Sequence, residues 1–186
     1  LTYEKGTRLF GSLERELFQP TCEELERLMY AAAMEILPSA GLLQYEISNF
    51  AQKGFRCRHN EVYWKGMPFY GFGPGAASYV DGRRAVNHRS VISWLKRVTS
   101  GKSPIMEEEE LTGEDRAREA IVLGLRRCDG IQKDEFRALT GYEIDCLAGE
   151  TINRYSELGL LEDVDSHVRL TREGRFLADA VFVDFL

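Results

Sequence analysis

The sequence lacks any hydrophobic run near the roughly 18 to 20 residues that a membrane-spanning helix needs. Its first residues also lack the charged-then-apolar order of a signal peptide, so a cytoplasmic location is expected. Basic residues are in the minority, because 24 lysines and arginines stand against 30 aspartates and glutamates, for a net charge of -6. Proteins that mainly bind nucleic acid present basic surfaces, so nucleic acid is not expected as a partner.

Clustered cysteines are also missing. The four cysteines are Cys22, Cys57, Cys128 and Cys146, and no two of them form a CxxC or CxxxCxxC motif. Zinc and iron-sulfur centres usually depend on such spacings, so no iron-sulfur ligands are expected in this chain. Reduced cysteine behaves as a small apolar residue, and buried free thiols are predicted.

The first part of the chain predicts an α/β arrangement. Hydrophobic residues make up 44% of the 186 residues, enough for a folded core. Residues 1–7 resemble the tail of a strand that runs into a glycine turn, without an initiator Met, so we expect a fragment of a longer protein. Thr21 and Glu24 have capping-box spacing and predict a helix that stops at 38–41. Alternating β-formers predict a strand over 44–50.

Residues 51–87 interleave glycines with aromatic residues, which predicts a shaped layer of loops. Glycine permits sharp turns or a close approach to a ligand, and aromatic rings supply flat contact area. Residues 88–100 regain a helical pattern. Residues 101–110 contain Gly101, Pro104 and an acidic run, which indicates a linker, and we place a domain boundary near residue 106. The predicted domains are therefore 1–106 and 107–186.

The second domain is predicted to be mostly helical. Thr112 and Asp115 are expected to cap a first helix, a second helix ends at Gly141, and a third ends at Gly159. A hairpin over 160–170 and a last helix capped by Thr171 follow. Three helices, a hairpin and a helix make up the order of a winged-helix module. Acidic residues outnumber basic ones here, and phosphate contacts need the opposite sign, so a lid or a partner-docking domain is the preferred interpretation.

Three blocks of the sequence resemble one family. They are YEISNFA at 45–51, RHNEVYW at 58–64 and GFGPGA at 71–76. These resemble the conserved blocks of HemW-type radical S-adenosylmethionine (SAM) proteins, a group that is often named as oxygen-independent coproporphyrinogen III oxidases. The tail over 170–186 is similar to the C-terminal domain of the same family. The resemblance covers essentially the whole chain, with the HNxxYW block more specific than the glycine-rich one.

The resemblance implies that the longer protein has a partial (β/α) barrel that holds a 4Fe-4S cluster and SAM. It also implies that this chain holds the last barrel elements, the loop layer and the winged-helix-like domain. The cluster ligands of the family lie in a CxxxCxxC loop, which this chain lacks. The chain alone is therefore expected not to cleave SAM.

The resemblance implies heme binding at the HNxxYW block. His59 is the expected axial ligand, since imidazole is a common ligand of heme iron, although a lone histidine is more often structural. Asn60 would orient the imidazole or the backbone turn. Tyr63 and Trp64 would form a flat wall for the macrocycle, with core packing as the alternative.

A second set of residues is expected to contact SAM or a porphyrin. Gly71, Gly73 and Gly75 could admit a cofactor or a porphyrin carboxylate, or could serve a strand corner that needs positive φ. Glu46 could orient a ligand, with a solvated strand face as the alternative. The other members of this set are Leu1 and Thr2. Arg56 and Arg58 could pair with heme propionates, or could be ordinary exposed arginines.

Three functions are compatible with these residues. The first is heme binding and delivery to acceptor proteins, such as those of the respiratory chain. The second is that the chain is a fragment of an oxygen-independent coproporphyrinogen III oxidase, an enzyme of porphyrin biosynthesis. The third is a winged-helix module that docks nucleic acid or protein. The HNxxYW block favours the first, because it separates HemW-like members from the true oxidases.

Overall fold

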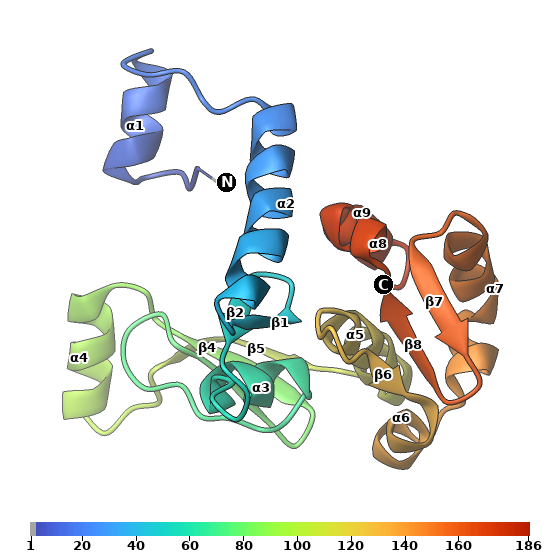
Figure 1. Cartoon of the computed structure of the whole chain (residues 1–186). Coiled ribbons are helices and arrows are strands. Elements are labelled where there is room, and N and C mark those ends of the chain that lie inside the picture. The colour runs from blue at the N-terminus through green and yellow to red at the C-terminus, as the bar shows by residue number, and fades with distance from the viewer. Residues whose placement is uncertain (1–2) are drawn as a thin grey trace.

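The computed structural model describes residues 3–186, which form two groups of elements (Figure 1). The first group ends with residue 110. It contains α1 (Arg8–Glu14), α2 (Glu23–Ser39), β1 (Leu43–Glu46), β2 (Asn49–Ala51), α3 (Arg58–Trp64), β3 (Ala77–Val80), β4 (Arg83–Asn87), α4 (Val91–Thr99) and β5 (Ile105–Glu110).

The second group contains the hydrophobic core. Its elements are α5 (Gly113–Leu125), β6 (Ile131–Gln132), α6 (Lys133–Thr140), α7 (Ile144–Glu157), β7 (Leu161–Val164), β8 (His167–Leu170), α8 (Arg172–Phe176) and α9 (Ala178–Val183). The strands form an antiparallel sheet in the order β6-β8-β7. Ile121, Val168, Val181 and Phe185 are completely buried in this core. The mixture of helices and sheet agrees with the prediction.

Local sequence signals predicted the helix starts and ends of the second group well. Thr112 and Asp115 form the predicted capping box at the start of α5. Gly141 adopts the left-handed conformation at the end of α6, and Thr171 caps α8 through the Gly174 backbone N–H. The predicted last helix is divided into α8 and α9 at Leu177, whose φ of -114° is not helical.

The first group departs from the prediction in three places. Residues 44–50 form a hairpin, β1 and β2, instead of one strand. Residues 51–87 contain α3 and the β3–β4 hairpin, so they are more than a layer of loops. Helix α2 begins after Cys22, and Thr21 forms no cap. The strand expected at the start of the chain includes residues 1–2, which lie outside the described residues, and residues 3–7 form no strand.

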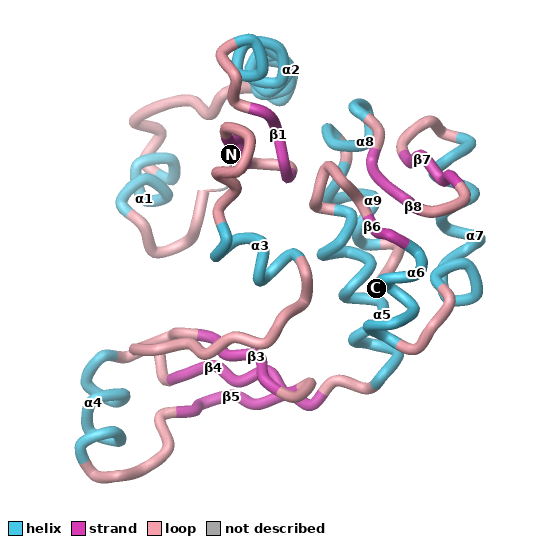
Figure 2. The backbone as a smooth tube through the Cα atoms, turned by 60° about the horizontal axis from the view of Figure 1, so that its bottom comes forward, coloured by secondary structure: helices cyan, strands magenta, loops and turns pink. Residues whose placement is uncertain are grey.

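The acidic run is a strand, and the prediction of a linker was wrong. Strand β5 pairs antiparallel with β4, which completes the sheet β3-β4-β5. The three strands lie side by side in Figure 2. Arg83 on β4 lies 3.9 Å from Glu108 and 3.3 Å from Glu110, and Arg84 lies 3.3 Å from Glu109. These cross-strand ion pairs offset the repulsion among the four successive glutamates, which would otherwise disfavour a strand.

The first group has little core of its own. Tyr45 is the one buried hydrophobic side chain within residues 3–110. The apolar stripes of α2 and α4 are largely exposed; they comprise Leu25, Leu28, Met29 and Ile36, and Val91, Ile92, Leu95 and Val98. The prediction of buried cysteines was also wrong for Cys22, Cys57 and Cys146, which are exposed at or near the starts of helices, while Cys128 is half-buried.

Candidate functional site

Strand β1 joins the two groups of elements. The Ile47 N–H donates to the Arg126 carbonyl at 3.1 Å, and the Cys128 N–H donates to the Tyr45 carbonyl at 3.0 Å. Glu46 and Arg127 form an antiparallel bridge between these bonds. The first block of the resemblance therefore lies at a junction between the two groups, which the sequence did not indicate.

Glu46 is a buried carboxylate within this junction. Its side chain is 0% exposed, so the interpretation as a solvated strand face was wrong. Oε1 accepts a hydrogen bond from the Ser48 N–H at 2.9 Å and another from the Asn49 side chain, which holds the turn between β1 and β2. Oε2 is buried and has no partner among the described residues. A role in orienting a ligand stays a prediction.

Helix α3 presents the HNxxYW residues on two faces. His59 and Tyr63 are four residues apart and therefore lie on one face. Their rings meet edge to face with centroids 4.9 Å apart, and His59 Nε2 lies 3.1 Å from the Tyr63 hydroxyl. His59 is exposed, so its imidazole is open to a ligand from solvent. Asn60, which was predicted to orient this imidazole, points instead to the Tyr45 hydroxyl at 3.4 Å.

Trp64 lies on the junction side of α3. The Arg126 guanidinium sits over its ring at 4.6 Å from the centroid, a favourable cation–π geometry. The Trp64 Nε1–H is buried without a partner among the described residues. The structure therefore brings His59 and Tyr63 together and places Trp64 elsewhere, so that Trp64 does not form one wall with Tyr63.

An aromatic ladder extends from His59 to the β3–β4 hairpin. The Tyr63 and Phe69 rings meet edge to face at 4.6 Å, and the Phe69 and Tyr79 centroids are 6.4 Å apart. Phe69 and Tyr79 also exchange both backbone hydrogen bonds, at 2.7 and 2.8 Å. The sequence showed these aromatic residues among the glycines, but no spacing indicated that they would pair with Tyr63.

The three glycines of the third block make close contacts within the chain. A Cβ on Gly71 would lie 2.1 Å from the Ala77 carbonyl oxygen. The Gly73 carbonyl accepts from the Asn87 side chain at 2.9 Å, and Gly75, with φ of +69°, donates to the His88 carbonyl at 3.0 Å. The close approach at Gly71 and the positive φ of Gly73 (+102°) and Gly75 account for glycine at each position without a ligand. Contact with a cofactor stays a prediction, and the other two members of that set, Leu1 and Thr2, lie outside the described residues.

Arg56 is not free to receive a propionate. Both of its terminal nitrogens bond to the Asp129 carboxylate, and Glu61 lies 3.9 Å away. The hydrogen bond from Arg56 lowers the pKa of Asp129 and raises that of Arg56 itself. Arg58, at the start of α3, is exposed, and its side chain forms no ion pair or hydrogen bond with the described residues.

The pair between Arg56 and Asp129 predicts a pH-dependent contribution to stability. Because the folded state lowers the pKa of Asp129, the contribution is present at neutral pH and is lost as the pH falls below the ordinary carboxyl range, about 3.9. The side chains are 39% and 46% exposed, so solvent screening limits the effect of Arg56→Ala to about 0.5 kcal/mol at pH 7. Urea unfolding should show this difference decreasing as the pH falls from 7 toward 3, with Arg58→Ala unchanged at both pH values. A difference that stays constant over this range would contradict the assignment.

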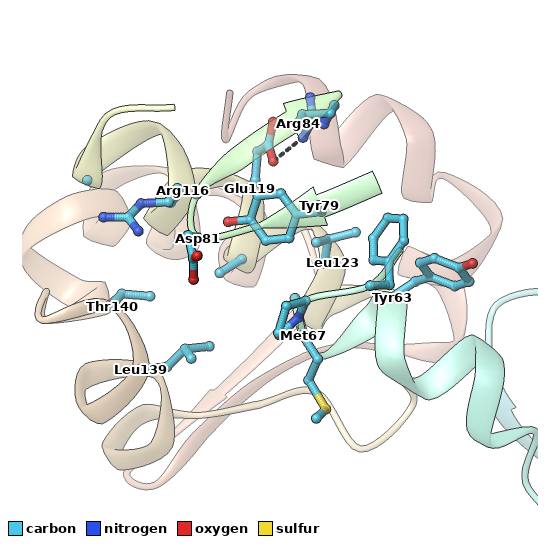
Figure 3. A pocket seen from close by; sticks show the side chains of 16 residues that line it. Tyr63, Met67, Tyr79, Asp81, Arg84, Arg116, Glu119, Leu123, Leu139 and Thr140 are labelled. Atoms are coloured by element: carbon cyan, nitrogen blue, oxygen red, sulfur yellow. Dashed lines mark hydrogen bonds and ion pairs between the residues drawn. The ribbon is translucent and has the colours of Figure 1, made fainter. Parts of the chain in front are cut away.

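A pocket of about 430 Å³ opens beside the aromatic ladder. Tyr63, Phe69 and Tyr79 contribute to one side, and helices α5 and α6 form the other (Figure 3). A smaller pocket of about 300 Å³ includes Trp64 and Phe136 in its lining. His59 lines neither of them.

Two kinds of site are not found in the described residues. Between residues 3 and 186, no three His, Cys, Asp or Glu side chains gather where a metal ion could be held. None of the helices in that range combines the length and the apolarity that a membrane crossing requires.

Comparison with known proteins gives three results. Residues 111–177 match the model of the HemN C-terminal domain. The heme chaperone HemW of Bacillus subtilis is 33% identical over the whole chain, which covers 49% of that relative, and the HemW of Lactococcus lactis is 32% identical, with 48% covered. The chain thus spans about half the length of these curated relatives.

The third result comes from solved structures. The coproporphyrinogen III oxidase HemN from Escherichia coli, described as a radical SAM enzyme, superposes with a TM-score of 0.71. The match covers 95% of this chain and 44% of that one, at 15% identity. At this identity, the likeness shows a shared fold.

Proposed function

We propose that the chain takes part in heme binding and in delivery of heme to acceptor proteins. It is similar to the C-terminal part of the radical SAM proteins HemW and HemN. The observation that carries this proposal is the exposed imidazole of His59, with Tyr63 one turn later on α3. The relatives named as heme chaperones align over the whole of this chain, which supports the same function.

Tyr63 would determine the tautomer of the His59 imidazole. A nitrogen that ligates iron needs a lone pair, and the hydrogen bond made by the other nitrogen fixes which one is free. If His59 Nε2–H donates to the Tyr63 hydroxyl oxygen, Nδ1 carries the free lone pair. We propose that heme binding uses this tautomer, with Tyr63 as the positioning residue and His59 as the ligand.

The residues present do not fit an iron-sulfur cluster, since the four cysteines are dispersed and the described residues contain no group of metal ligands. In the proposed longer protein, the cluster and SAM would therefore be held elsewhere, and radical chemistry would depend on residues outside this chain. The shared fold with HemN keeps the oxidase as the second candidate for the longer protein.

We also propose that the second group is a winged-helix-like docking domain. Helices α5, α6 and α7 precede the β7–β8 hairpin, and β6 adds a third strand. A boundary at Leu111 fits better than one at residue 106, because β5 pairs with β4 and the HemN C-terminal match starts at 111.

The proposal is tested by titrating the chain with hemin. A sharpened Soret band is expected. Tyr63→Phe should weaken the affinity by about tenfold, as is usual when the partner of a metal-binding histidine is lost. Tyr70→Phe removes an exposed hydroxyl that has no hydrogen bond among the described residues, so it should leave the affinity unchanged. Equal weakening by both variants, or none by Tyr63→Phe, would refute the positioning role.

A further inference from the structure

The larger pocket has two facing apolar walls and a charged rim, and it is continuous with the ladder from His59. Phe69 and Tyr79 form its wall on the hairpin side, while Ala120 and Leu123 of α5 and Leu139 of α6 form the facing wall. Its volume, about 430 Å³, falls within the range of roughly 300 to 1,000 Å³ that small-molecule sites occupy. Leu139 is 65% exposed and Met67 is 48% exposed, so the pocket is open to solvent and a larger ligand can project from it.

Some of the charged side chains around the pocket form ion pairs, and others do not. Arg84 and Glu119 lie 2.6 Å apart and neutralise each other, as the dashed line in Figure 3 shows. The side chain of Arg116 forms no ion pair or hydrogen bond with the described residues, and neither does the side chain of Asp81. Figure 3 places Tyr63 at one end of the pocket and Arg116 at the other. A ligand against these aromatic rings would therefore reach an unpaired guanidinium at its far end.

An anionic group is favoured by the unpaired guanidinium of Arg116. This guanidinium lies against Gly82, where an added Cβ would be 3.0 Å from Nη1. Gly113, the first residue of the 13-residue helix α5, also lines the pocket, but Glu114 and Asp115 already place two carboxylates in the first turn of this helix. Asp81 also opposes an anion, so substitution of Asp81 can test the charge of the ligand.

We infer that this pocket binds a carboxylate-bearing tetrapyrrole, with the ring against Phe69 and Tyr79 and one carboxylate on Arg116. The inference rests on the proposed function and deepens it, because it adds a ring-binding subsite at the far end of the ladder that begins at His59. The subsite recognises the macrocycle and its carboxylate, and it needs no bond to iron. A porphyrin without metal is therefore the probe that separates this subsite from His59.

The test is a fluorescence titration of the whole chain with metal-free protoporphyrin IX. Leu139→Glu puts a carboxylate at the mouth and should weaken binding by about tenfold or more. Leu158→Glu is the matched control, since Leu158 is 63% exposed and does not line the pocket. Arg116→Ala should weaken binding by about tenfold, the loss of one charge-assisted hydrogen bond. Arg118→Ala, on the same helix outside the pocket, should not.

Asp81→Asn decides the sign of the ligand charge. It should tighten binding of protoporphyrin IX by about two- to threefold, because one repelling charge is removed. Equal affinities for Leu139→Glu and Leu158→Glu, or weaker binding by Asp81→Asn than by the wild type, would overturn the inference. His59→Ala should leave the metal-free porphyrin unaffected. Loss of hemin binding alone in His59→Ala would support the proposed function. Loss of protoporphyrin IX binding in Leu139→Glu would support the subsite.

Discussion

Gly71→Ala is expected to lower the free energy of unfolding of the region around the β3–β4 hairpin by about 3 kcal/mol. The added Cβ would lie 2.1 Å from the Ala77 carbonyl oxygen and 3.0 Å from the Ala77 nitrogen, which are backbone atoms and cannot rotate away. The Gly71 N–H also bonds to the Ser78 hydroxyl at 2.8 Å, so any shift of the backbone would break this bond. Urea unfolding and hydrogen exchange of β3 and β4 measure the effect without heme.

A matched control exists in α7. A Cβ on Gly149 would meet nothing within 4 Å, and its φ is not positive. Gly149→Ala should therefore leave stability nearly unchanged, because Gly149 follows the kink of α7 at Ala148 and lies outside a regular helix interior, where alanine stabilises. If Gly71→Ala kept full stability and lost only affinity for hemin, Gly71 would be a ligand contact instead of a packing requirement.

Features that depend on neighbours in sequence were predictable. The capping box of Thr112 and Asp115, the stop at Gly141 and the β7–β8 hairpin all arise within a few residues, and each was found where it was expected. Such signals are local because a cap or a turn satisfies backbone groups beside it. This explains why the second group was described better than the first.

Features that depend on distant partners were not predictable. Residues 107–110 become a strand only because Arg83 and Arg84, more than twenty positions earlier, lie across from them. Glu46 is buried because the Arg126–Cys128 segment covers β1. No periodicity in the sequence encodes either contact, since both are set by how the elements meet.

The candidate site was predicted in part. The resemblance identified His59 and Tyr63, and their spacing of four residues explains why they share a face of α3. It paired Asn60 with His59, whereas the structure shows Tyr63 in contact with His59, and it did not reveal Phe69, Tyr79 or Arg116. The pocket is formed where the hairpin meets two helices of the second group, so its lining is scattered along the sequence.

His59→Ala is expected to have the largest effect on hemin binding. Loss of an axial ligand should weaken the affinity by about 100-fold, which corresponds to roughly 3 kcal/mol. The chain supplies two matched controls, His88→Ala and His167→Ala, because neither residue contacts α3 or the ladder in any ring pair or hydrogen bond of the described residues. Both should bind hemin with nearly the affinity of the wild type. Equal losses in all three variants would indicate nonspecific binding.

The most direct test of heme ligation by His59 is chemical rescue of that variant. Absorption spectra of the ferric hemin complex are recorded for the wild type and for His59→Ala, without and with added imidazole. We predict that His59→Ala loses the sharpened Soret band and that imidazole, which can occupy the vacated position, restores it in this variant while leaving the wild-type spectrum unchanged. A His59→Ala complex that already shows the wild-type spectrum and affinity without imidazole would contradict the account, and His59 would then be a structural residue of α3.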